Sequence, residues 1–250
     1  MAETGGALSF GDRFTVWSSV AGGRRFVVKP GEPPVSSIET DEPASALAAE
    51  IDPRQLAMVV GNASDQRIAV VTIDGRVVRR LNGARGPFQS MAAAPDGSAL
   101  YYSSSGVIWR IPTTDGSPQR IHEGESMAPY PDGKALLIQM ETGQGHQWFR
   151  MSLPSGEVRP VEIRGDLRIA ANRLGPNAVR SDGAIVHERV PVNSWFYRPC
   201  ILENGSDVLK EIPIDFAGDV VALNWTRDGR LVARGAALRS RMWRIRRSAK

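Results

Sequence analysis

The stretch "SMAAAPDG", Ser90 to Gly97, returns as "SMAPYPDG", Ser126 to Gly133, 36 positions later. A near-identical phrase at this spacing indicates a repeat architecture. The Asp-Gly step recurs along the chain at Asp96-Gly97, Asp132-Gly133, Asp182-Gly183 and Asp228-Gly229. A short β-prone run follows each step: "ALYYS", "ALLIQM", "AIVHE" and "RLVAR". Because glycine accepts a positive φ without penalty, Asp-Gly between apolar runs predicts a tight turn between two strands.

A second landmark follows each of these runs: an aromatic residue directly before an arginine. The pairs are Trp109-Arg110, Phe149-Arg150, Tyr197-Arg198 and Trp243-Arg244, at 14, 18, 16 and 16 residues from the turn aspartate. In the first three units another turn comes five or six residues later, at Asp115-Gly116, Ser155-Gly156 and Asn204-Gly205. Each unit therefore predicts four short antiparallel strands in roughly 40 residues, which is typical of a propeller blade.

Two further units are predicted upstream. Residues 46 to 83 fit the template with the first turn at Asp52 to Gln55, and residues 6 to 45 form a looser unit. We interpret "ETDEPASALAAE", Glu39 to Glu50, as a connector between them, because it lacks a 3.6-residue apolar stripe. The last unit ends after its third strand, so either residues around "GALSF", Gly6 to Phe10, supply the missing strand or the array is incomplete.

The predicted fold class is therefore all-β: a β-propeller of five or six four-stranded antiparallel blades. We expect a single domain over residues 6–250, because six units of this size leave no room for a second domain. The approximate units are 6–45, 46–83, 84–122, 123–164, 165–216 and 217–250.

The phrases "PDGSALYYSSSGVIWRIPTTDG", Pro95 to Gly116, and "PDGKALLIQ", Pro131 to Gln139, carry a resemblance. They resemble the WD-repeat-like (WD40-like) propeller repeats of bacterial TolB-type proteins and of sensor domains attached to bacterial kinases and winged-helix regulators. The resemblance covers roughly residues 46 to 247. The "GH…WD" signature of true WD repeats is missing, and "VRSDG", Val179 to Gly183, lacks the proline. The resemblance implies a propeller fold and brings no catalytic motif.

Composition limits which classes of partner and which cellular compartments we expect. The 31 basic and 27 acidic residues give a net charge of +4, so no nucleic acid partner is expected, and a solvated strand is favoured over a phosphate-binding tail for Arg239 to Lys250. The single cysteine, Cys200, forms no internal disulfide or zinc cluster, which favours a reducing compartment. With no signal peptide and no membrane span in the sequence, we expect a cytoplasmic protein as written, or a periplasmic or extracellular one if the chain is part of a longer protein.

Candidate catalytic groups have simpler structural interpretations. "GESMA" around Ser126 resembles a nucleophile elbow, but its repeat equivalent Ser90 has no flanking glycines. His122, His146 and His187 fall in three different units, whereas a metal site needs converging ligands. Each turn aspartate is expected to accept a hydrogen bond from the backbone N–H of the residue two positions later. We therefore predict no catalytic residue, metal or cofactor, and lean against an enzyme.

The sequence favours a binding or sensory module without chemistry of its own. Its partner would be a protein or a small ligand, bound at the loop faces or in the central channel. Candidate contact residues lie in the irregular segments 83–88, 163–175 and 189–198: Arg85, Phe88, Arg168, Arg173 and Trp195. Two alternatives stay open: a propeller-type enzyme, such as a lactonase-like or lyase-like hydrolase with a site at the channel mouth, and the sensor portion of a bacterial kinase or transcriptional regulator.

The aromatic-arginine steps generate a first prediction. Neighbours on a strand face opposite sides, so the ring of Trp109 should pack between units while Arg110 reaches water or a partner. Trp109→Ala should lower the free energy of unfolding by about 3 to 5 kcal/mol if the ring is buried. Urea denaturation measures this loss, and a value under about 1 kcal/mol would show that the ring is exposed.

Overall fold

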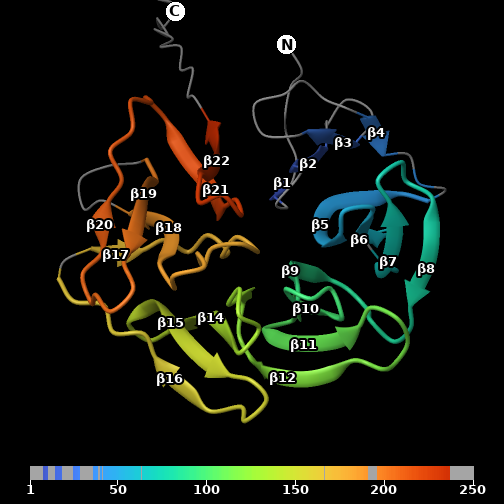
Figure 1. Ribbon diagram of the computed structural model, residues 1–250, viewed down its shortest axis with the longest axis horizontal. Coiled ribbons are helices and arrows are strands. Elements are labelled where there is room, and N and C mark those ends of the chain that lie inside the picture. The colour runs from blue at the N-terminus through green and yellow to red at the C-terminus, as the bar shows by residue number, and fades with distance from the viewer. Residues whose placement is uncertain are drawn as a thin grey trace, which may run out of the picture.

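A computed structural model describes residues 8–10, 15–18, 25–28, 36–38, 40, 42–62, 64–165, 167–190 and 196–236. Within these ranges the chain is all-β and contains no helix. The strands form five four-stranded sheets and one two-stranded sheet, arranged about a common centre (Figure 1). The sheets contain only antiparallel pairs, and consecutive strands are neighbours, as the repeat pattern predicts.

The six sheets follow one another along the chain. The first contains β1 (Leu8–Phe10), β2 (Thr15–Ser18), β3 (Arg25–Val28) and β4 (Ser36–Ile38). The second contains β5 (Ala44–Asp52), β6 (Gln55–Val60), β7 (Arg67–Thr72) and β8 (Val77–Leu81). The third contains β9 (Phe88–Ala93), β10 (Ala99–Ser104), β11 (Val107–Pro112) and β12 (Gln119–Glu123).

The fourth sheet contains β13 (Ser126–Pro129), β14 (Ala135–Thr142), β15 (Gly145–Ser152) and β16 (Val158–Pro160). The fifth contains β17 (Arg168–Ile169), β18 (Ile185–Val190), β19 (Arg198–Leu202) and β20 (Lys210–Glu211). The sixth contains β21 (Asp219–Trp225) and β22 (Leu231–Ala236). Trp243-Arg244 lies outside the described residues.

The first strands of neighbouring sheets lie against one another near the centre. β5 contacts β9, β9 contacts β13, and β1 contacts both β5 and β21. Figure 1 shows β5 and β9 toward the centre, with β8 and β12 on the outside. We call β1, β5, β9, β13 and β21, together with residues 170–178 of the fifth sheet, the inner segments.

The Asp-Gly turns are confirmed. In each, the glycine N–H donates to the carbonyl of the residue three positions earlier, at 2.8 to 2.9 Å; the acceptors belong to Ala94, Tyr130, Arg180 and Thr226. The turn glycines have φ between 69° and 92°, the left-handed region that follows a type I turn. At Gly97 a Cβ would also lie 2.5 Å from the Ile51 carbonyl, so the third sheet's turn sits directly against the end of β5.

One sequence prediction is wrong, and one of the two alternatives for the last unit is not supported. "ETDEPASALAAE" is no connector, because β5 begins at Ala44 and forms the inner strand of the second sheet. Its alanines suit this place, since small side chains such as Ala48 and Ala49 pack closely near the centre, where both are buried. The described part of "GALSF" does not complete the last sheet, because β1 pairs with β2 of the first sheet.

Side chains fill the space between neighbouring sheets. Met91 and Tyr102 of the third sheet belong to one buried cluster with Ala57 of the second, and Met127 of the fourth belongs to another with Tyr101 of the third. The Trp109 ring is only partly buried, against the cluster between the second and third sheets. Phe149 packs in the same way between the third and fourth sheets.

The third aromatic-arginine pair is shifted in register, contrary to the sequence interpretation. Arg110 pairs with Tyr101 and Arg150 with Leu137, five residues beyond the turn aspartate in each case. In the fifth sheet the equivalent residue, His187, pairs with Cys200. Tyr197 therefore precedes β19, where its N–H donates to Asp219 Oδ1 at 2.8 Å.

Buried polar side chains join the third sheet to the fourth and the fourth to the inner segment of the fifth. Ser103 Oγ donates to the Glu125 carbonyl at 2.7 Å. Gln139 Nε2 donates to the Asn172 carbonyl at 2.7 Å, while its Oε1 accepts from Trp148 Nε1 at 3.2 Å. Ser126 Oγ accepts from the Leu174 N–H at 3.0 Å. These bonds satisfy groups that would otherwise be buried without a partner.

A substitution of Gln139 tests how much these hydrogen bonds contribute to the free energy of unfolding. Gln139→Leu keeps the side chain's approximate volume but leaves the Asn172 carbonyl and the Trp148 N–H without partners, so it should lower the free energy of unfolding by about 2 to 4 kcal/mol. Urea denaturation measures the loss. The exposed Gln144 provides the control, because Gln144→Leu should change stability by less than about 0.5 kcal/mol. Equal losses for the two variants would contradict the assigned role.

Candidate functional site

Two hollows lie at opposite ends of the inner segments. The first, which we call the carboxyl-end hollow, has a volume of about 380 Å³ and is lined where the inner segments end. Five sheets contribute to it; among its residues are Asp52, Pro95, Pro129, Pro131, Arg180, Ser181, Trp225 and Arg227. Prolines at these positions present rigid apolar surface with no N–H group, beside charged groups of both signs. Such a mixture suits recognition of an extended chain or a small polar molecule.

Arg180 is a charged group of this hollow that is held by an aromatic ring and two carboxylates. Its guanidinium lies over the Trp225 ring, 4.7 Å from the centroid. Asp182 accepts from its Nε and Nη2 at 2.9 and 2.7 Å, and Glu203 lies 3.3 Å from Nη2. Hydrogen bonding to Arg180 lowers the pKa of Asp182 to about 2, with a further contribution from the Ala184 N–H. The two carboxylates thus hold the guanidinium over the indole ring.

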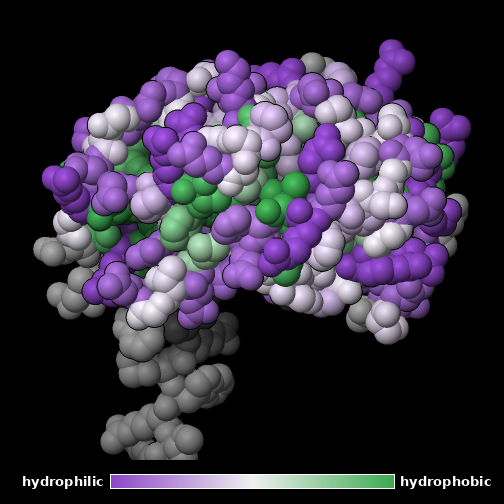
Figure 2. Space-filling model, turned by 90° about the horizontal axis from the view of Figure 1, so that it is seen from below, coloured by the Kyte–Doolittle hydropathy of each residue, from purple (hydrophilic) through white to green (hydrophobic). Residues whose placement is uncertain are grey.

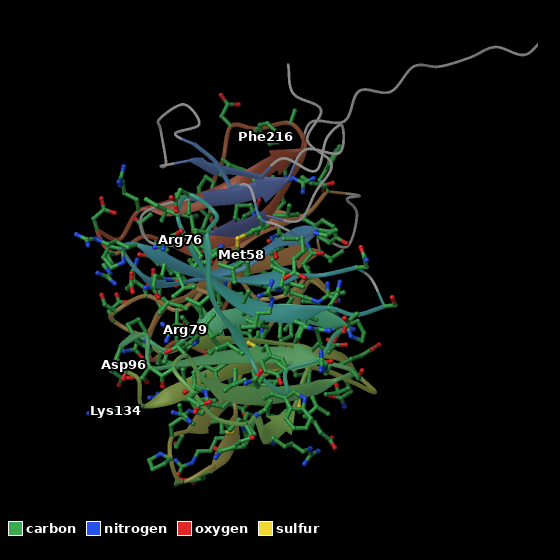
Figure 3. All side chains as sticks on the ribbon, turned by 90° about the vertical axis from the view of Figure 1, so that its right-hand side faces the viewer. Met58, Arg76, Arg79, Asp96, Lys134 and Phe216 are labelled. Atoms are coloured by element: carbon green, nitrogen blue, oxygen red, sulfur yellow. The ribbon has the colours of Figure 1, made fainter. Side chains whose placement is uncertain are left out.

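The other turn aspartates accept hydrogen bonds from residues of their own turns. Asp96 and Asp132 accept from the N–H groups of Ser98 and Lys134 at 3.0 and 2.9 Å. The Ser98 N–H lowers the pKa of Asp96. Asp96, and Lys134 directly after the Asp132-Gly133 step, lie on the same side of the molecule in Figure 3. Asp228 instead accepts from Thr226 Oγ1 at 2.5 Å and from Arg230 Nε at 2.7 Å. All four carboxylates have partners within their own turns.

The second hollow, the amino-end hollow, has a volume of about 460 Å³ and is lined near the start of the inner segments. Its polar side chains are Gln89, Ser90, Glu125, Asn172, Arg173 and Asn224. Pro176 lines both hollows. The two hollows therefore share one wall, provided by the irregular inner segment of the fifth sheet.

A larger groove of about 800 Å³ lies between the third and fourth sheets. It is lined by Tyr101, Arg110, Ile121, Leu153 and other residues of these two sheets. Seen from the side of β12 and β16, apolar side chains gather in a hollow between polar ones (Figure 2). Burial raises the pKa of Tyr101, and Arg110 partly offsets this effect.

The five candidate contact residues are not brought together. Arg173 lines the amino-end hollow, whereas Arg168 is exposed on β17. Arg85 is exposed with its Nη1 3.5 Å from Asp65, and Phe88 packs edge-on against Tyr102 at 5.3 Å. Trp195 lies outside the described residues.

The side chains that could act as a nucleophile, a base or a metal ligand make structural contacts instead. Ser126 is fully buried and accepts a backbone N–H. His122, His146 and His187 contact the Glu123 carbonyl, Glu125 and Glu188, respectively. Burial raises the pKa of Cys200 to about 12, so its thiol is protonated at neutral pH. In the ranges that the structure covers, no three His, Cys, Asp or Glu side chains form a possible metal site.

Comparison with known proteins gives a likeness of fold. No protein-family model matches the sequence, and no curated protein matches it. TolB from Acinetobacter baumannii is similar in structure, with a TM-score of 0.64 and 18% identity over 88% of this chain and 57% of that one. A putative TolB from Agrobacterium tumefaciens has a TM-score of 0.68 and 14% identity, over 91% of this chain and 88% of that one. These likenesses show a TolB-like β-propeller fold.

A third solved structure extends this likeness beyond TolB proteins. Hydrazine synthase from Kuenenia stuttgartiensis has a TM-score of 0.59 and 16% identity, over 92% of this chain and 74% of that one. The present chain therefore spans just over half of the Acinetobacter TolB chain and about three quarters of the Kuenenia one. Among the described residues, no helix is long and apolar enough to cross a bilayer.

The lowered pKa of Asp182 predicts a pH dependence of stability. Its pKa is about 2 in the folded protein and about 3.9 when unfolded, so its stabilising effect is present above pH ~4 and is lost as the pH falls towards 2. Asp182→Asn should therefore lower Tm near neutral pH, with a difference that shrinks below pH ~4. Thermal scans across this range test this, with Asp215→Asn at an exposed site as control. A pH-independent difference would contradict the assignment.

Proposed function

We propose that the chain is a binding module without chemistry of its own, which recognises a segment of a partner protein at the carboxyl-end hollow. The observation that carries this proposal is the convergence of five sheets on that hollow. Rigid prolines, an indole with a guanidinium stacked on it and carboxylates meet there within about 380 Å³. An extended peptide can present alternating apolar and charged side chains to such a surface. The TolB-like fold of the solved neighbours supports a protein-interaction role.

We further propose that the six sheets are six blades of a closed ring. The contact of β1 with both β5 and β21 supports closure, because it places the first sheet between the second and the sixth. Closure would remove exposed inner edges, which otherwise invite association. It would also complete the wall of both hollows on the side between β5 and β21.

The alternative of a propeller-type enzyme has less support. A hydrolase needs a nucleophile beside a base, or a metal with converging ligands. Ser126 is instead engaged by the Leu174 N–H, and the histidines lie in separate contacts. In the carboxyl-end hollow, Arg180 is a fixed cation. Such a cation can bind an anionic group of a ligand but does not activate a nucleophile.

A blocking substitution tests the partner site. Ser181 is exposed and lines the carboxyl-end hollow, so Ser181→Trp should fill the hollow without disturbing the core. The full chain serves as bait in native lysate, and proteins eluted with increasing salt are identified by mass spectrometry. We expect at least one saturable partner that Ser181→Trp loses and that Gln144→Trp, at an exposed turn outside the hollow, retains. Absence of a saturable partner, or equal capture by Ser181→Trp, would overturn the proposal.

A further inference from the structure

The amino-end hollow has the character of a second, separate ligand site. Its volume of about 460 Å³ falls within the range of small-molecule sites, about 300 to 1,000 Å³. Leu47, Met91, Leu174 and Val221 give it an apolar lining. Polar and charged side chains are set into this lining at a few points, the usual composition of a small-molecule site.

The two charges of this hollow do not neutralise each other. Glu125 faces His146, whose Nδ1 lies 3.1 Å from its Oε2. Arg173 is exposed, and no hydrogen bond or ion pair of its guanidinium is found in the part of the chain that the structure describes. The hollow thus offers a free cation on one wall and a carboxylate on another. A ligand that carries both charges would satisfy both groups at once.

The walls that carry these groups are fixed in place. Ser103 holds the Glu125 backbone through its carbonyl, and Gln139 and Ser126 hold residues 172 and 174 on either side of Arg173. On β21 of the neighbouring sixth sheet, Ala222 adopts a positive φ of 58°, a conformation that non-glycine residues rarely adopt. Asn224 Nδ2 donates to its carbonyl at 3.0 Å, and Asn224 Oδ1 accepts from the Asn177 N–H at 2.9 Å. A preorganised wall reduces the entropic cost of binding.

One polar atom in the lining residues lacks a partner. Gln89 Oε1 is buried and accepts no hydrogen bond, and Ser90 Oγ has only the weak acceptor Met127 Sδ, at 3.7 Å. Both residues precede Met91 on β9 and lie along the same hollow.

We propose that the amino-end hollow binds a zwitterionic small molecule of the amino-acid class, with its carboxylate on Arg173 and its ammonium group toward Glu125. The site is independent of the partner site at the carboxyl-end hollow, because the charged groups used are different. The stacked Arg180 and its two carboxylates play no part in it.

Each proteinogenic L-amino acid is tested alone for a rise in the Tm of the full chain, and the best binder is measured by calorimetry. We expect at least one amino acid to bind, and both its methyl ester and its N-acetyl form to bind about tenfold more weakly or worse, since each removes one charge. No binding by any amino acid would overturn the proposal. Full binding by the N-acetyl form would also overturn it, because a simple carboxylate would then suffice.

Two substitutions locate the site. Arg173→Gln and Glu125→Gln should each weaken binding about tenfold or more, and Arg173→Gln should abolish the difference between the amino acid and its methyl ester. Arg168→Gln is the matched control, because Arg168 is exposed on the same segment but does not line the hollow. Ser181→Trp, which fills the other hollow, should leave amino-acid binding unchanged. Equal binding by Arg173→Gln and Arg168→Gln would exclude this hollow.

Discussion

The fold depends on polar side chains that reach from one sheet to the backbone of the next. Neighbouring sheets are not joined by strand pairing, so apolar packing alone would leave their mutual rotation loosely defined. Ser103 bonds the third sheet to the fourth, Gln139 the fourth to the fifth, and Asn224 the fifth to the sixth. Each of the three side chains is buried, so the loss of its bond would be costly. The positions of the inner segments, and hence of both hollows, follow from these contacts.

The fifth sheet shows how far this principle extends. Its first strand, β17, has only two residues, and residues 170–178 continue without a regular ladder. They are held instead by bonds to both neighbours: Leu174 and Asn172 to the fourth sheet, Asn177 to the sixth. Because the segment need not follow strand geometry, its side chains point into both hollows. Irregular backbone fixed by a rigid scaffold is the usual setting for a binding site.

The sequence was informative where structure is local. Asp-Gly turns depend on a few adjacent residues, and so they could be placed from the sequence. β5 could not, because its alanines have low strand propensity and become a strand only through packing at the centre. Of the four predicted contact residues that the structure describes, Arg173 alone lines one of the two hollows. Arg180 and Trp225 were missed because they come from separate units. Aligning the residues that precede each turn would have placed both at the same end of the inner segments.

That alignment also explains how one repeat produces two different hollows. The residue whose carbonyl closes each Asp-Gly turn is Ala94, Tyr130, Arg180 or Thr226, and its backbone role is the same in all four units. The main-chain carbonyl closes the turn in every unit, although the side chain differs: an alanine, a tyrosine, an arginine and a threonine. The carboxyl-end hollow draws its chemistry from such positions, with Arg180 stacked on Trp225. The amino-end hollow is lined near the start of the inner segments instead. Its charged residues, Glu125 and Arg173, are not part of any Asp-Gly turn. Binding chemistry at the two ends can therefore differ while the scaffold stays the same.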